Sequence, residues 1–364
     1  MKERLSIIFG VFVVMALSNA VVPVLPFFAK ELPAVQGAIF SAYFLGAFLT
    51  VYPAGLLSDK IGKVLLVRAG LVLTLISGIA IALTSGVYEV ILFRFIEGIG
   101  GGMFVSAALS WVNEQEDHKH LTGYFYACLN LGLVLGLLAA GILEPPVGER
   151  GGIILFTVLS VLPLILNVSA KETVPAIKAK AETLRIISDY RWLYLSTIIL
   201  VGSTGVLTSL YPEFTDESPL ILSMMIGIMN VSTIIASIAA SRITFNPVPG
   251  IRIGALLMAV SVTLAYFAPA AGLVPVMIVF ILTGLVAGFI FVGQTDFLAG
   301  TGYRQGVIVG LFNTAAYGGM TFLPFISGLF SQYFNYFSGF IVTALLSLVV
   351  VLTIGRCGCR IRVN

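Results

Sequence analysis

The stretch that decides the fold is Gly55-Leu56-Leu57-Ser58-Asp59-Lys60-Ile61-Gly62-Lys63. It places charges and two glycines between long apolar runs, in a chain where only 10% of the residues are charged. A segment of this kind is typical of a short loop at a membrane face, because glycine permits a sharp turn and a close approach of helices. We predict that Gly55 and Gly62 shape this loop and that Asp59, Lys60 and Lys63 lie at the membrane surface.

The composition excludes a soluble protein. Hydrophobic residues make up 59% of the 364 residues, and the mean hydropathy is +1.06. A helix that crosses a bilayer needs about 20 mostly apolar residues. The sequence contains twelve such runs, at roughly 5–28, 34–57, 64–84, 88–112, 121–143, 152–170, 193–211, 220–241, 251–269, 273–298, 306–330 and 335–355. We therefore predict an all-α integral membrane protein with twelve spans.

The distribution of basic residues predicts the orientation. Lys and Arg favour cytoplasmic loops. With the N-terminus inside, Lys30 and Arg150 fall in outer segments, Arg94 falls within a span, and the rest of the 20 basic residues fall in inner segments. This bias predicts a multi-pass protein of the cytoplasmic membrane with both termini inside. The net charge of +3 follows from this topology and gives no support to a nucleic-acid partner.

The two halves of the chain repeat each other at an offset of 186 positions. Pro26 matches Pro212 and Phe28 matches Phe214. Further pairs at this offset are Glu31 with Glu217, Pro33 with Pro219, Gly98 with Gly284, Gly102 with Gly288 and Gly132 with Gly318. Parallel repeats are a known transporter architecture. We predict two six-helix bundles related by pseudo-two-fold symmetry, at 1–170 and 193–364. The charged cytoplasmic linker at 171–192 is predicted to include a short amphipathic helix.

Three motifs resemble those of the major facilitator superfamily of secondary transporters. The pattern G-x-L-x-D-[RK]-x-G-[RK] at residues 55–63 resembles the family's loop between its second and third helices. Residues 94–102 resemble its R-x-x-x-G-x-G element, and residues 132–141 resemble the G-x-x-x-G-P-x-x-G-G element of its antiporters. In the last element Leu137 stands in place of proline and Ala140 in place of glycine. The resemblance covers the whole chain and favours the drug:proton antiporter branch more weakly than the family.

The resemblance implies a substrate cavity between two bundles that open it to each side in turn. In that family the loop cluster latches the bundles on the cytoplasmic side. This implies a latch role for Gly55, Asp59, Lys60, Gly62 and Lys63, with a partner near Gly306. The alternative is that the charges form a solvated turn that only follows the bias of basic residues.

Arg94 and Glu97 are ionisable residues inside a predicted span. Charges in such a place cost at least about 2.5 kcal/mol on insertion scales and usually serve function. Three positions apart, the two side chains share one face of a helix. We predict that Glu97 takes up and releases a proton, while Arg94 holds substrate or modulates the pKa of that carboxyl group. The alternative is a permanent ion pair that only positions the helix.

Other polar and small residues within the spans are candidates for lining the cavity or for packing helices together. Spans that line the cavity in the resembling fold offer Asn19, Tyr124, Tyr126, Asn130, Gln294, Asn313 and Tyr317 as cavity residues. Each of them alone is more often an interhelical hydrogen bond. Small residues let helices approach closely, so we assign helix packing to Gly98, Gly100, Gly102, Gly132 and Gly136. The acidic loop with Glu114, Glu116 and Asp117 is interpreted as solvated.

These observations favour a secondary transporter that exports an apolar or amphipathic solute in exchange for protons. Proton-coupled uptake of a small metabolite remains open, and a membrane enzyme or channel is less favoured. Three cysteines and two histidines offer no complete tetrahedral metal site, and no catalytic constellation is evident. We expect no cofactor and no metal. The expected partners are the solute, protons and the lipid bilayer, and the expected state is a monomer.

Overall fold

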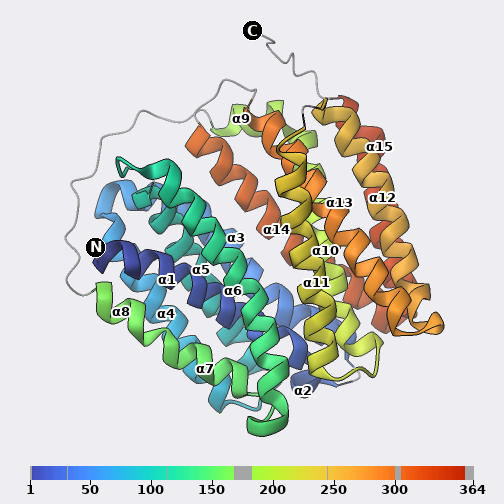
Figure 1. Ribbon diagram of the computed structural model, residues 1–364, viewed down its shortest axis with the longest axis horizontal. Coiled ribbons are helices and arrows are strands. Elements are labelled where there is room, and N and C mark those ends of the chain that lie inside the picture. Colours follow the sequence, from blue (N-terminus) through green and yellow to red (C-terminus); the bar gives the residue numbers. More distant parts are fainter. Residues whose placement is uncertain are drawn as a thin grey trace. The chain divides into compact units, whose positions relative to one another are not determined.

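The computed structural model describes residues 2–30, 32–112, 114–167, 183–243, 245–299 and 305–356, and every regular element within them is a helix (Figure 1). Side chains of a few further residues inside helices, Asp59 among them, are not described. The α-helices are α1 (Lys2–Ala20), α2 (Leu25–Ala29), α3 (Pro33–Ile61), α4 (Lys63–Leu83), α5 (Val87–Val112), α6 (His118–Val147), α7 (Gly151–Leu159), α8 (Val161–Asn167), α9 (Thr183–Asp189), α10 (Arg191–Phe214), α11 (Pro219–Ala240), α12 (Pro247–Phe267), α13 (Leu273–Ala299), α14 (Gln305–Tyr333) and α15 (Tyr336–Thr353). Short 3-10 turns are η1 (Val22–Val24), η2 (Ala268–Ala271) and η3 (Ile354–Arg356).

The helices account for the predicted membrane spans. In the described ranges, 10 helical segments are long and apolar enough to cross a bilayer. The predicted span 152–170 corresponds to a shorter apolar stretch, Gly151–Asn167, and the predicted span 306–330 corresponds to α14. The all-helical membrane fold is therefore confirmed. The predicted helix on the linker corresponds to α9, while residues 168–182 of the linker lie outside the described residues.

Two predicted spans are interrupted rather than continuous, and proline explains both breaks. The first changes from α1 through η1 to α2 where Pro23 and Pro26 occur. The sixth breaks between α7 and α8, just before Pro163. Proline has no backbone N–H and its ring collides with the carbonyl four residues earlier, so a regular helix cannot continue through it unchanged.

The segment 55–63 is mostly helical, which corrects the prediction of a loop. Helix α3 continues to Ile61, and α4 begins at Lys63. Gly62 alone separates them, with φ at 103°, a conformation that glycine adopts at little cost. Gly55 lies within the helix, where a Cβ would come 2.9 Å from Ser106 Oγ on α5. The turn is therefore one residue long, and Gly55 serves helix approach.

The chain divides into two compact units. Unit 1 comprises Met1–Glu31, Ile39–Ala179 and Asp216–Met224, and unit 2 comprises Leu32–Ala38, Lys180–Thr215 and Met225–Asn364. The units follow the two halves of the chain except for the two short segments that begin α3 and α11. At the offset of 186 that relates the halves, the first segment corresponds to residues 218–224, which lie within the second. In unit 2, Gln36 donates a hydrogen bond to Glu213 Oε2 at 2.5 Å, which ties the start of α3 to α10.

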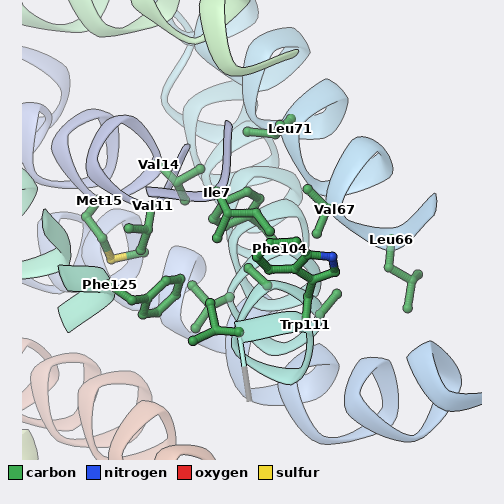
Figure 2. Packing of buried hydrophobic residues seen from close by; sticks show 14 of the residues in the cluster. Ile7, Val11, Val14, Met15, Leu66, Val67, Leu71, Phe104, Trp111 and Phe125 are labelled. Carbon is green, nitrogen blue, oxygen red and sulfur yellow. The ribbon is translucent and has the colours of Figure 1, made fainter. Parts of the chain in front are cut away.

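The core of unit 1 is an apolar cluster that holds α5 against α1 and α4 (Figure 2). Phe104 of α5 is fully buried; its ring lies against Gly10 of α1, and its Cβ and backbone nitrogen lie against Gly70 of α4. Around it pack Ile7, Val11, Val14, Met15, Leu66, Val67, Leu71, Trp111 and Phe125. This cluster fixes the helix that carries both intramembrane charges.

Close contact at glycine holds the helices together in both units. Lipid tails are as apolar as leucine, so association of helices within a bilayer depends on tight packing more than on the hydrophobic effect. A Cβ on Gly98 of α5 would overlap the carbonyl of Tyr43 on α3, and a Cβ on Gly284 of α13 would overlap the carbonyl of Met229 on α11. Each glycine and its carbonyl partner are 186 positions from their counterparts. The repeat therefore extends to the contacts themselves.

Candidate functional site

The charged pair of α5 lies on one face of that helix. Arg94 and Glu97 are three positions apart, so their side chains emerge on neighbouring positions of the same side. No proline interrupts α5 from Val87 to Val112, and the apolar cluster around Phe104 anchors the next two turns. The pair therefore projects from a rigid element.

The two side chains form a buried ion pair. Arg94 Nη1 donates to Glu97 Oε2 at 2.7 Å, and the side chains are 1% and 0% exposed. Within the described part of the chain, Arg94 Nε and Glu97 Oε1 have no hydrogen-bond partner. The structure thus places both residues between helices of unit 1 and leaves one donor and one acceptor of the pair unused.

A third residue, Tyr43 of α3, completes the site. The centre of its ring lies 4.8 Å from Arg94 Cζ, which is within the range of a cation–π contact. Tyr43 is 2% exposed. Sequence reasoning missed it, because an aromatic residue in an apolar span carries no signal of what it faces.

This arrangement can exchange a proton without losing its cation. Arg94 remains charged at any physiological pH, whereas a carboxylate can be protonated. Removing one partner of a buried ion pair typically costs about 3–5 kcal/mol, because the other charge is left uncompensated. Protonation of Glu97 would therefore change the forces on Arg94 strongly, and this is what a coupling site requires.

The predicted cavity residues divide into three groups. Asn19 Nδ2 donates to the Leu133 carbonyl at 3.0 Å and joins α1 to α6, while Gln294 Nε2 donates to Ser196 Oγ at 3.1 Å and joins α13 to α10. Asn130 Nδ2 donates to the Tyr126 carbonyl, one turn earlier on α6. Tyr124 is exposed, and the half-buried side chains are those of Tyr126, Asn313 and Tyr317. Asn19, Asn130 and Gln294 thus make helix contacts, and the solute role of the whole set stays a prediction.

Among the predicted latch residues, Gly55 and Lys63 have partners inside unit 1. Lys63 is buried and forms an ion pair with Glu114, which follows α5. Ser58 Oγ donates to the Gly55 carbonyl at 2.8 Å, and Lys60 is exposed. The Asp59 side chain lies outside what the structure describes, so the latch itself stays a prediction.

The acidic loop after α5 is solvent-exposed, and two of its acids also form ion pairs. Besides the pair between Glu114 and Lys63, Asp117 accepts two hydrogen bonds from Arg4, at 2.7 and 2.9 Å. Both acids thus tie the loop to the start of another helix, α4 or α1.

The predicted packing glycines lie at helix crossings of unit 1. A Cβ on Gly132 or Gly136 of α6 would overlap backbone carbonyls of α1, those of Phe12 and Ala16 respectively. A Cβ on Gly100 would come 2.8 Å from the Gly70 carbonyl of α4, and one on Gly102 would overlap Thr50 of α3. Any larger residue at these positions would push two helices apart.

Comparison with known proteins points to one family. The family model described as Major Facilitator Superfamily matches residues 7–319. The multi-drug resistance efflux pump PmrA homolog of Lactococcus lactis subsp. lactis (strain IL1403) is 28% identical over an alignment of 179 residues, and the match covers 44% of each chain. The quinolone resistance protein NorA of Staphylococcus aureus (strain MRSA252) is 23% identical over an alignment of 230 residues, and the match covers 59% of each chain. These matches span less than two thirds of either relative.

Solved structures share the fold across nearly the whole chain. A mutant of the nucleoside transporter NupG has a TM-score of 0.77 at 14% identity and covers 98% of this chain and 100% of its own. The human organic anion transporter MFSD10 (TETRAN) has a TM-score of 0.71 at 15% identity and covers 97% of this chain and 99% of its own. At these identities the likeness concerns the fold alone.

Proposed function

Because the chain belongs to the Major Facilitator Superfamily and is thus a multi-pass membrane transporter rather than an enzyme, we propose that it exports an apolar or amphipathic solute in exchange for protons. The observation that carries the proposal is the buried pair of Arg94 and Glu97, in which one carboxylate oxygen has no described partner. The efflux pump among the relatives supports the direction of transport.

In the proposed mechanism Glu97 is the proton carrier. Its proton enters when the site opens to the more acidic side, and it cancels the charge that holds Arg94. Because α5 crosses α3 at bare glycine contacts, a change in the pair acts directly on the packing of these two helices. Release of the proton on the other side restores the ion pair and completes the cycle. Binding of the proton and binding of the solute thus favour two different arrangements of the α3–α5 crossing.

The remaining predicted roles belong to the same proposal. The cytoplasmic latch consists of Gly55, Asp59, Lys60, Gly62 and Lys63. The solute path is lined by Tyr124, Tyr126, Asn313 and Tyr317, and Asn19, Asn130 and Gln294 lie beside it. We also propose the cytoplasmic membrane as the location, with both termini inside, and a monomer as the working unit. The orientation is tested with the variants Lys60→Cys and Lys30→Cys in intact cells. A thiol reagent that cannot cross the membrane should label position 30 and not position 60, and a membrane-permeant reagent should label both.

Transport by the purified protein in proteoliposomes tests the proposal. A quinolone and a lipophilic cationic dye serve as probes, and a thermal-shift screen of wild type against Arg94→Ala widens the choice of solutes. For an antiporter, addition of a transported probe to vesicles with an acidic lumen releases lumenal protons. Uptake by symport would instead acidify the lumen when the outside is acidic. Dissipation of the probe gradient without any saturable exchange of labelled probe would indicate a channel.

The decisive variant is Glu97→Gln, which keeps the shape of the side chain and cannot titrate. We expect it to abolish proton-driven movement while exchange of labelled probe persists. Glu89→Gln is the matched control, because Glu89 is an exposed carboxylate on the same helix, bonded to Thr84. Proton coupling that survives in Glu97→Gln would remove Glu97 from the mechanism.

A further inference from the structure

We propose that Tyr43 is a positioning residue that holds the Arg94 guanidinium by its ring face whenever Glu97 is neutral. The inference rests on the proposed proton coupling and adds a residue to it. The starting observation is geometric, because the Tyr43 ring centre lies 4.8 Å from Arg94 Cζ while Arg94 Nη1 bonds Glu97. The guanidinium thus has two partners on two helices, and of the two the carboxyl group is the proposed proton carrier.

The need for such a partner follows from burial. Arg94 is 1% exposed, so water cannot replace the carboxylate once Glu97 is protonated. An uncompensated cation in an apolar span is unfavourable. An aromatic face attracts a cation through its quadrupole, and the attraction is larger when both groups are desolvated. The ring therefore stabilises the protonated state of the site, which lacks the ion pair.

Two glycines of α5 make room for this contact. A Cβ on Gly98 would overlap the Tyr43 carbonyl, and a Cβ on Gly101 would come 2.6 Å from the Tyr43 hydroxyl oxygen. Gly98 and Gly101 lie one and four positions after Glu97. Tyr43 thus contacts α5 from Arg94 to Gly101, and these contacts depend on the absence of side chains at Gly98 and Gly101.

The other elements packed on α5 bring no second titratable group to the pair among the described residues. Arg94 is the one charged neighbour of Glu97. Helix α4 meets this part of α5 through Gly70, Leu73 and Thr74, and α2 contains no titratable side chain. The described charges of α1 lie in its first turn, and α6 packs on α5 through the apolar cluster that contains Phe125. Tyr43 is therefore the remaining candidate for holding the cation.

The internal repeat supplies independent support. At the offset of 186 positions, Tyr43, Arg94 and Glu97 correspond to Met229, Phe280 and Thr283. The glycine contact is the same in both units, since Gly98 meets the Tyr43 carbonyl as Gly284 meets that of Met229. Packing at this crossing therefore does not require tyrosine. The aromatic ring occurs in the unit that has the charge to hold.

The test compares Tyr43→Phe, which keeps the ring face, with Tyr43→Met, which copies the residue of the repeat. Proton-coupled transport is measured against pH. We expect Tyr43→Phe to keep the wild-type profile. Tyr43→Met should move the pH midpoint about one unit toward acid, which is equivalent to about 1.4 kcal/mol, because the protonated state loses its support. Phe40→Met is the matched control, a buried aromatic residue three positions earlier on α3, and should leave the midpoint unchanged.

Thermal unfolding in detergent gives a second readout that needs no solute. The loss of melting temperature on Tyr43→Met should be larger in the Glu97→Gln background than in wild type, because the ring is then the main partner of Arg94. Incorporation of 3,4,5-trifluorophenylalanine at position 43 keeps the shape of phenylalanine and weakens the negative ring face. It should reproduce the acid shift relative to Tyr43→Phe even if Tyr43→Met fails to fold.

The outcomes separate this inference from the proposed function. Loss of coupling in Glu97→Gln, together with an unchanged pH midpoint in Tyr43→Met and in the fluorinated variant, would overturn the role of Tyr43 alone. Equal losses of melting temperature in both backgrounds would overturn it as well. Retained coupling in Glu97→Gln would instead overturn the proposed function.

Discussion

The crossing of α3 with α5 in unit 1 and the crossing of α11 with α13 in unit 2 use the same glycine contacts but carry different chemistry. Gly98 and Gly284 each lie on a carbonyl of the neighbouring helix. Around the first lie Arg94 and Glu97, and at the equivalent places around the second lie Phe280 and Thr283. The scaffold of the repeat therefore does not depend on the charges. Since charges within a span are unfavourable, their presence in one unit points to function.

The largest expected effect comes from breaking the ion pair on one side only. Arg94→Met leaves a buried carboxylate without its partner and should destabilise the protein by about 3–5 kcal/mol. The double variant Arg94→Met/Glu97→Leu leaves the crossing without charges, as in unit 2, and should recover most of that stability while proton coupling stays lost. Thermal unfolding and proteoliposome transport measure the two effects. A double variant no more stable than the single one would mean that the pair itself is needed for folding.

The next effect should be equal in both units. Gly98→Ala and Gly284→Ala each place a methyl group against a backbone carbonyl, which cannot rotate away, and each should cost about 2–3 kcal/mol. Gly227→Ala is the control, because a Cβ at Gly227 of α11 meets nothing within 4 Å. Melting temperatures in detergent compare the three. A strong loss in one unit with none in the other would contradict a shared scaffold.

A smaller effect should follow from the ion pair between α4 and the acidic loop. Lys63 is 3% exposed but Glu114 is 36% exposed, so solvent screens the pair in part. We expect Lys63→Met to cost about 1 kcal/mol. The charge exchange Lys63→Glu/Glu114→Lys should restore part of it, as measured by thermal unfolding.

The smallest effect should be that of Arg4→Gln. The Arg4 and Asp117 side chains are 45% and 41% exposed, and exposed pairs contribute about 0.2–1 kcal/mol. The difference from wild type should vanish in about 1 M salt, where charges are screened within a few ångströms. An effect of Arg4→Gln that persists at high salt would indicate that Arg4 has a role besides this pair.

Much of the fold was predictable from local pattern. The sequence predicted an all-helical membrane protein with an internal repeat. The prediction came from apolar runs of bilayer length, from the charged breaks between them and from the constant offset between the halves. The errors lie where the backbone departs from a simple span. Pro23, Pro26 and Pro163 interrupt helices, and residues 55–61 continue one. Hydropathy is a window average, so it is insensitive to a single imino acid or a single positive φ.

The candidate site was predictable only in its charged half. Arg94 and Glu97 stand out because charges are rare in spans, and helix geometry alone puts them on one face. Tyr43 is 51 positions before Arg94 and looks like any other aromatic residue of an apolar run. Glu114 and Asp117 likewise resemble solvated loop residues until their partners Lys63 and Arg4 are seen.

By itself, the sequence determined that the chain is a membrane protein, that its two halves repeat each other and that only the first half carries the charged pair within a span. These properties depend on composition and on the spacing of residues along the chain. Only the tertiary structure decided which residues face that pair, because a helix crossing joins residues that no local pattern relates. The ring over Arg94 exists because Gly98 and Gly101 let α3 approach α5, and this approach is a property of two helices together.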